Sequence, residues 1–170
     1  MLSKKLGAAL NEQMNNELYS AYFYLGARSY FEEQELPGFA NFFQIQSAEE
    51  LTHAMKVFDY LHRVGGKAHL QAIAAPKLNY KSVLEAFENA LANERKLAHE
   101  IGALLDLAAS EKHAPTQIFM QWFVTEQVEE ESLFVRCISR IKRAGMDGQG
   151  LLILDQEMGR RAAEPGNGGA

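Results

Sequence analysis

Apolar side chains recur every three or four positions along four long stretches of the chain, which predicts four amphipathic α-helices. These stretches cover about residues 4–35, 38–64, 80–111 and 115–144, and a shorter one covers about 147–159. A helix of about 30 residues is roughly 45 Å long. We therefore expect an all-α protein built on four long helices of matched length, with a short fifth helix near the C-terminus.

Helix-breaking residues fall between these stretches. Only four prolines occur in 170 residues, and Pro37 with Gly38 marks the first turn. Pro115 suits the first turn of the fourth helix, where its missing N–H would have no partner in any case. Ser82 and Asp147 are the expected N-caps of the third and fifth helices, because their side-chain oxygens can accept hydrogen bonds from free backbone N–H groups.

The lengths of the connections predict the topology. A few residues join the first helix to the second and the third to the fourth, so each pair should be antiparallel. About fifteen residues, 65–79, join the second helix to the third, and at roughly 3.3 Å per extended residue they can run the length of a bundle. We predict an antiparallel four-helix bundle with one long crossover between helices 2 and 3. Residues 1–160 form this single domain, and residues 161–170 are expected to be a disordered tail.

Each predicted buried stripe carries an acid near its midpoint. The stripe residues with ionisable side chains are Glu17, Glu50, His53, Glu94 and Glu130. The midpoints meet in an antiparallel bundle, so these groups and the amide of Gln127 would converge. Burying unpaired carboxylates is costly, and their mutual repulsion raises their pKa values unless a cation lies among them. No lysine or arginine stands at this level of the stripes, so a polyvalent cation is the simplest explanation.

The spacing of the ligands indicates which metals suit the site. Glu50 and His53 are three residues apart, so both reach the same side of one helix. Oxygen-rich sites with one imidazole suit iron or manganese better than structural zinc, which prefers nitrogen and sulfur ligands. Two metal ions would share four carboxylates more evenly than one, with Glu50 as the candidate bridge.

Several further residues near this level have two interpretations. Gln127 is either a metal ligand or a hydrogen-bonding group inside the bundle. Tyr24, two helical turns from Glu17, is either a half-buried core tyrosine or a redox-active or hydrogen-bonding neighbour of the metals. The neighbouring acids are either ordinary surface residues or part of a third metal position: Glu49, Glu126 and Glu129.

Composition excludes several classes of protein. The formal net charge is −5 and no basic run occurs, which argues against a protein that coats nucleic acid. No apolar stretch approaches the roughly 18 residues of a transmembrane span, and the N-terminus has no apolar signal-peptide region. The one cysteine, Cys137, excludes an intramolecular disulfide and a Cys-x-x-Cys metal site. We expect a cytoplasmic protein with no membrane partner.

Three motifs and one isolated acid carry a family resemblance. The motifs are Asn-Glu-Gln-Met-Asn-Asn-Glu-Leu-Tyr-Ser at 11–20, Ala-Glu-Glu-Leu-Thr-His at 48–53 and Phe-Met-Gln-Trp-Phe-Val-Thr-Glu-Gln-Val-Glu-Glu-Glu at 119–131, and the isolated acid is Glu94. With them the chain resembles the non-haem bacterial ferritins from about Leu6 to Arg160, nearly its whole length. In such ferritins the matching residues form a di-iron ferroxidase centre.

The resemblance implies a role for each matching residue. It implies iron ligands at Glu17, Glu50, His53, Glu94 and Glu130, with Gln127 close by. Glu50 would bridge the two ions, the first held with Glu17 and His53 and the second with Glu94 and Glu130. The resemblance also implies a third iron position at Glu49, Glu126, Glu129 and Glu130. Leu51 stands where the related bacterioferritins carry a haem-binding methionine, so no haem is expected.

The function implied by this resemblance is iron storage. A shell of twenty-four subunits would oxidise Fe(II) with O2 or H2O2 at the di-iron centre and hold the Fe(III) as mineral inside. Two alternatives remain open from the sequence. One is a di-iron or manganese enzyme of the peroxidase type that does not mineralise iron. The other is a metal-free structural bundle.

Overall fold

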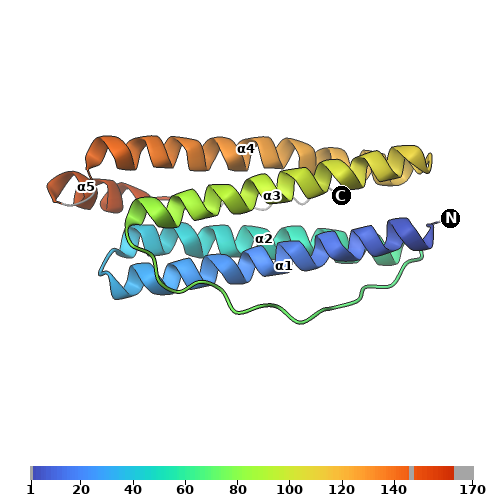
Figure 1. Cartoon of the computed structure of the whole chain (residues 1–170), viewed down its shortest axis with the longest axis horizontal. Helices are drawn as coiled ribbons and strands as arrows, with labels where there is room; N and C mark the ends of the chain where they lie inside the picture. The colour runs from blue at the N-terminus through green and yellow to red at the C-terminus, as the bar shows by residue number, and fades with distance from the viewer. Residues whose placement is uncertain (1, 146–147, 163–170) are drawn as a thin grey trace.

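A computed structural model of the chain describes residues 2–145 and 148–162, and this part consists of five α-helices without a strand. The helices are α1 (Lys4–Glu33), α2 (Pro37–Arg63), α3 (Val83–Ser110), α4 (Ala114–Ala144) and α5 (Gln149–Met158). The first four lie side by side along the long axis of the molecule, and α5 lies at one end (Figure 1). The predicted four-helix bundle with a short fifth helix is confirmed.

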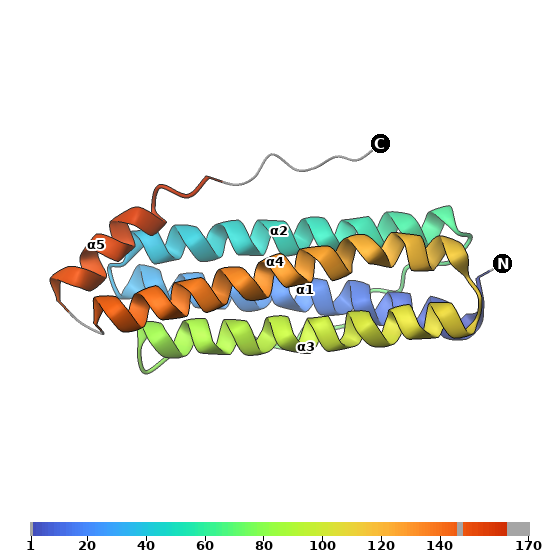
Figure 2. The ribbon, with the colours of Figure 1, turned by 90° about the horizontal axis from the view of Figure 1, so that it is seen from above.

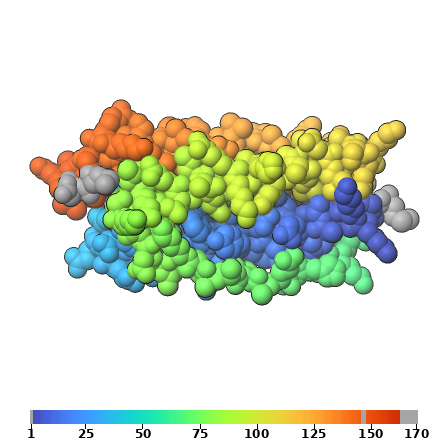
Figure 3. All heavy atoms as spheres, in the orientation of Figure 1, coloured from blue at the N-terminus to red at the C-terminus, as the bar shows by residue number. Residues whose placement is uncertain are grey.

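The crossover between α2 and α3 runs along the outside of α1 for the length of the bundle, as predicted (Figures 1 and 3). Two asparagines on α1 hold its backbone. Asn11 donates from Nδ2 to the carbonyl of Lys67 at 2.9 Å and accepts from the N–H of His69. Asn15 donates to the carbonyl of His69, also at 2.9 Å. These amides satisfy backbone groups that an extended segment would otherwise leave to water.

The helix ends follow local capping chemistry. Ser82 caps α3 by accepting a hydrogen bond from the N–H of Glu85 at 3.1 Å, as predicted. The helix therefore begins at Val83, a few residues later than the apolar pattern indicates. Pro115 lies in the first turn of α4, as predicted. Asp147, the other expected N-cap, lies outside the described residues.

The apolar core is divided into two clusters at opposite ends of the bundle. The cluster near α5 is largely aromatic and includes the fully buried Phe31, Phe39, Phe43, Phe87 and Phe134. The other includes the fully buried Leu6, Leu10, Met14 and Leu61, with Phe123. Each such side chain contributes roughly 1.5–3 kcal/mol on burial. Together the two clusters stabilise the polar layer that lies between them.

The fifth helix is anchored on the first turn of α2 (Figure 2). The carboxylate of Asp155 accepts a hydrogen bond from the N–H of Phe39 at 2.9 Å, which places a negative charge at the N-terminus of α2, where the helix dipole favours it. Gly38 permits this approach, because a Cβ there would lie 1.6 Å from the carbonyl oxygen of Asp155. No helix in the described ranges is both long and apolar enough to cross a bilayer.

This contact predicts opposite effects of two glycine substitutions. Gly38→Ala forces α5 away from α2. At Gly102 in α3 the described chain, apart from its own helical turns, places nothing within 4 Å of an added Cβ. Alanine is favoured over glycine in a helix by roughly 0.5–1 kcal/mol. We expect Gly38→Ala to lower, and Gly102→Ala to raise, the melting temperature of the metal-free protein. Similar shifts in both variants would contradict the α5 contact.

Candidate metal centre

The four long helices bring the predicted acids into one buried layer between the two apolar clusters. None of the predicted ligands in this layer exposes more than 8% of its surface: Glu17, Glu50, His53, Glu94, Gln127 and Glu130. The layer forms because each residue falls in the apolar phase of its helix, at the level where antiparallel neighbours cross. The side chains that the stripes predict to be buried together are therefore buried together.

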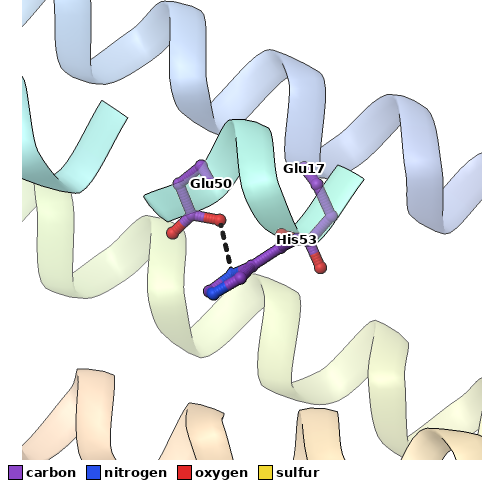
Figure 4. A group of neighbouring side chains, drawn as sticks. All are labelled: Glu17, Glu50 and His53. Carbon is purple, nitrogen blue, oxygen red and sulfur yellow. Dashed lines mark ion pairs between the residues drawn. The ribbon is translucent and has the colours of Figure 1, made fainter. Parts of the chain in front are cut away.

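Glu17, Glu50 and His53 form the tightest part of this layer (Figure 4). One ligand atom from each lies within 4.8 Å of the other two. Glu17 projects from α1, while Glu50 and His53 project from adjacent turns of α2 because they are three residues apart (Figure 4). Two oxygens and an imidazole nitrogen at this separation can coordinate a single metal ion.

One oxygen of Glu50 lacks a hydrogen bond. Among the described residues, Glu50 Oε2 is the buried side-chain polar atom without a hydrogen-bond partner. His53 Nδ1 lies 3.3 Å away, but the contact does not have hydrogen-bond geometry. An unsatisfied buried acceptor costs roughly 1–3 kcal/mol, and more when it is charged. A cation beside this oxygen would supply the missing partner, so the residues present fit a bound metal.

Glu94 is held by two side chains that the sequence left with two interpretations. The hydroxyl of Tyr24 donates to Glu94 Oε1, and Gln127 Nε2 donates to Oε2 at 2.6 Å and to the backbone carbonyl at 2.8 Å. Tyr24 is fully buried, with its ring stacked near Phe134 at a centroid distance of 5.9 Å. In this structure Tyr24 and Gln127 are therefore hydrogen-bonding neighbours that orient Glu94.

Two glutamines complete the layer, and the sequence analysis did not assign either to the site. Gln46 Nε2 donates to Glu130 Oε2 at 2.8 Å, and Gln13 Nε2 donates to Glu17 Oε1 at 2.7 Å. The apolar phase of the second helix includes Gln46, so its burial was a usable signal. Gln13 lies at the edge of the apolar phase of the first helix, seven residues after Leu6 and four before Glu17, so its spacing was also a usable signal.

Burial raises the pKa of every acid in the layer. Desolvation is the largest cause for all four, and repulsion from neighbouring carboxylates adds to it at each of them. The pKa values of Glu17 and Glu50 lie well above the usual range, that of Glu94 rises to about 7 and that of Glu130 to about 8. Hydrogen bonds from Tyr24 and Gln127 limit the rise in the pKa of Glu94. The charge of His53 lowers the pKa values of Glu17, Glu94 and Glu130, but not enough to offset burial.

The acids predicted for a third metal position lie at the edge of this layer. Glu49 is partly buried and forms an ion pair with Arg161, whose Nη2 lies 3.2 Å from Oε2. Glu126 is partly buried and Glu129 is exposed. Within the described ranges, these acids do not join the group formed by Glu17, Glu50 and His53. The third position stays a prediction.

The predicted tail, 161–170, lies almost wholly outside the described residues. Its first two residues, Arg161 and Ala162, are described, and Arg161 is held against α2. Helical periodicity could not indicate this contact, because Arg161 follows the last stretch in which it occurs.

The sequence matches the family described as Ferritin-like domain over residues 7–144. The chain therefore belongs to the ferritin-like family. It is 41% identical to the bacterial non-heme ferritin of Staphylococcus saprophyticus over 162 residues and 38% identical to that of Staphylococcus aureus over 161 residues. Each alignment covers 95% of this chain and 97% of the relative.

Solved structures give the same result. An open pore ferritin from the hyperthermophilic archaeon Archaeoglobus fulgidus superimposes with a TM-score of 0.94 at 41% identity, over 95% of this chain and 99% of that one. A humanized archaeal ferritin superimposes with a TM-score of 0.95 at 41% identity, over 97% of this chain and 100% of the other. These similarities extend across the bundle and α5.

The raised pKa of Glu130 predicts a stabilising substitution. An unfolded glutamate titrates near pH 4.5, whereas folded Glu130 keeps its proton to about pH 8. The free energy of unfolding of the metal-free protein therefore falls as the pH rises between these values, by about 1.4 kcal/mol per pH unit. Glu130→Gln removes this penalty, and its amide can still pair with Gln46.

We expect Glu130→Gln to raise the melting temperature of the metal-free protein, and by more at pH 8 than at pH 5. Thermal unfolding followed by circular dichroism at both pH values measures this difference. An equal effect at the two pH values, or a lower melting temperature at pH 8, would show that Glu130 carries no burial penalty.

Proposed function

We propose that this chain stores iron, oxidising Fe(II) at a di-iron ferroxidase centre inside each subunit and keeping the Fe(III) as mineral within a hollow shell of identical subunits. The observation that carries the proposal is the unsatisfied Glu50 Oε2, buried in a layer of four carboxylates and one imidazole. Membership of the ferritin-like family supports it, as do relatives named bacterial non-heme ferritin. The proposed shell has twenty-four subunits and lies in the cytoplasm.

The ligands divide between two iron ions. Glu17 and His53 hold the first ion, because their ligand atoms form one group with Glu50. Glu94 and Glu130 hold the second, and Glu50 bridges the two ions with its unsatisfied oxygen. Repulsion from Glu94 and Glu130 contributes to the raised pKa of Glu50, which supports the closeness of the two halves.

Two residues act through Glu94 rather than on the metal directly. Tyr24 and Gln127 each donate a hydrogen bond to one of its carboxylate oxygens. Such partners fix the direction of a ligand's lone pairs and so the position of the metal.

Charge balance explains why the substrate is a pair of divalent ions. Four ionised carboxylates carry four negative charges, which two Fe(II) ions neutralise. Hard oxygen ligands favour the higher oxidation state of iron.

Two Fe(II) ions supply two electrons, which with two protons reduce O2 to H2O2 or reduce H2O2 to two molecules of water. The resulting six positive charges exceed the four negative ones, which favours hydrolysis of Fe(III) and its release toward the mineral.

The proposal extends to the edge of the layer. Glu49, Glu126 and Glu129, together with Glu130, are proposed as a third iron position through which iron is held or passes between the centre and the interior. Repulsion from Glu49 contributes to the raised pKa of Glu130, which supports the closeness of this position to the centre. No haem takes part in the proposed reaction.

Removing a ligand tests the centre. We expect Glu17→Ala and Glu130→Ala to slow the initial oxidation of Fe(II) by at least about tenfold, since losing even a side chain that orients a metal ligand typically costs 10–100-fold. Stopped-flow absorbance at two Fe(II) per chain measures the rate, and size-exclusion chromatography checks assembly. Glu131→Ala is the matched control, because Glu131 lies on the same helix and pairs with Arg95 outside the layer. Normal rates in the ligand variants would show that the assignment is wrong.

A further inference from the structure

Arg161 places a positive charge at the edge of the carboxylate layer. Its Nη2 donates to both oxygens of Glu49, at 3.2 and 3.4 Å, and its Nη1 donates to Gln46 Oε1. The guanidinium carbon lies 4.7 Å from the centroid of the Phe42 ring, within range of a cation–π interaction. The side chain is 23% exposed, so it is enclosed more than a typical surface arginine.

The backbone around Arg161 is fixed by the same contacts that anchor α5. Asp155 holds the helix on the first turn of α2 through the N–H of Phe39. Two residues further along α2, Asn41 donates from Nδ2 to the carbonyl of Arg161 at 3.1 Å. The guanidinium is therefore carried to Glu49 by a short segment attached at two points, and pairing with Glu49 costs little further conformational entropy.

Arg161 contacts an acid assigned above to the third iron position. A guanidinium stays charged at all physiological pH values and matches both oxygens of a carboxylate. A third cation therefore competes with Arg161 for Glu49. We propose that Arg161 is a built-in cation that closes the third iron position, so that each bundle binds two iron ions tightly and a third weakly. This inference rests on the proposed function.

The second contact of Arg161 supports the same role. A guanidinium carries hydrogen-bond donors alone, so Gln46 must turn its oxygen toward Arg161 and its NH2 group toward the other side. That NH2 group donates to Glu130 Oε2 at 2.8 Å. Glu130 belongs to both the di-iron centre and the proposed third position. Arg161 thus neutralises one acid of the third position and, through Gln46, occupies an oxygen of another.

The closure of the third position by Arg161 is reversible. The pair of Arg161 with Glu49 is partly buried, so it is stronger than an exposed ion pair, yet it is a non-covalent contact that a metal ion can displace. The affinity for a third cation is reduced by the fraction of time in which Glu49 is free. Displacing the guanidinium would thus admit a third ion at high iron concentration and exclude it at low concentration.

Anaerobic calorimetric titration of Fe(II) into the assembled, metal-free full-length protein tests the proposal. Without oxygen no iron is oxidised, so the measured heat reports binding alone. We expect two tight sites per chain in the wild type, in Arg161→Gln and in Arg160→Gln. In Arg161→Gln a third site should bind at least about tenfold more tightly than in the wild type. Arg160→Gln is the matched control, because it removes the same charge from the exposed residue that directly precedes Arg161.

Two further variants identify the cause. Arg161→Lys keeps the positive charge beside Glu49. Because the proposal attributes the closure to this charge, the third site should stay weak, within about threefold of the wild type. The double variant Glu49→Gln with Arg161→Gln should lose the gained site, because the acid that Arg161 covered is gone. A gained site that survives Glu49→Gln would place the third ion elsewhere and overturn the proposal.

The outcomes separate the two proposals. An unchanged third site in Arg161→Gln, or an equal gain in Arg160→Gln, would overturn the role of Arg161 and leave the di-iron centre intact. Absence of two tight sites in the wild type would overturn the di-iron centre, and the role of Arg161 with it.

Discussion

Four carboxylates that are buried at one level of a helix bundle cannot all be ionised unless positive charge lies between them. The surrounding residues do not remove this constraint. Hydrogen bonds from Gln13, Gln46 and Gln127 lower the pKa values of the acids, but these amides bring no charge, and burial raises the pKa values by more. The layer is a source of instability in the metal-free protein and becomes electrically balanced with two divalent cations. Binding of metal is thus coupled directly to the stability of the fold.

The rest of the architecture makes this layer tolerable. Aromatic side chains fill the bundle on the side nearest α5, and aliphatic and aromatic side chains fill the other side, so the polar level is bounded by well-packed core in both directions. The crossover along α1 is held through Asn11 and Asn15, which leaves the inward face of the helix to Glu17. The anchoring of α5 at the start of α2 brings the chain back toward Glu49. Elements remote in sequence therefore all help to position the charged groups at one level of the bundle.

Helical periodicity was enough to predict the bundle and the buried acids, because Glu17, Glu50, Glu94 and Glu130 replace apolar residues in otherwise regular stripes. Periodicity could not decide the role of Tyr24, since its hydrogen bond to Glu94 depends on the separation of two helices. Gln13 carried a weak signal, because it lies at the edge of the stripe, where a polar side chain is usually exposed. Arg161 carried none, since its position depends on how α5 docks, and docking depends on the Asp155 contact and the space left by Gly38.

The amount of iron that each chain retains tests the account most directly. Increasing amounts of Fe(II) are added in air to the metal-free protein, the protein is separated by size, and iron is assayed in the protein peak. The account predicts a large assembly that retains far more iron than the two or three ions that the ligands of one bundle can hold. A plateau near two ions per chain would contradict storage and indicate a di-iron enzyme that does not mineralise. No retained iron would contradict the metal centre itself and leave a structural bundle with costly buried acids.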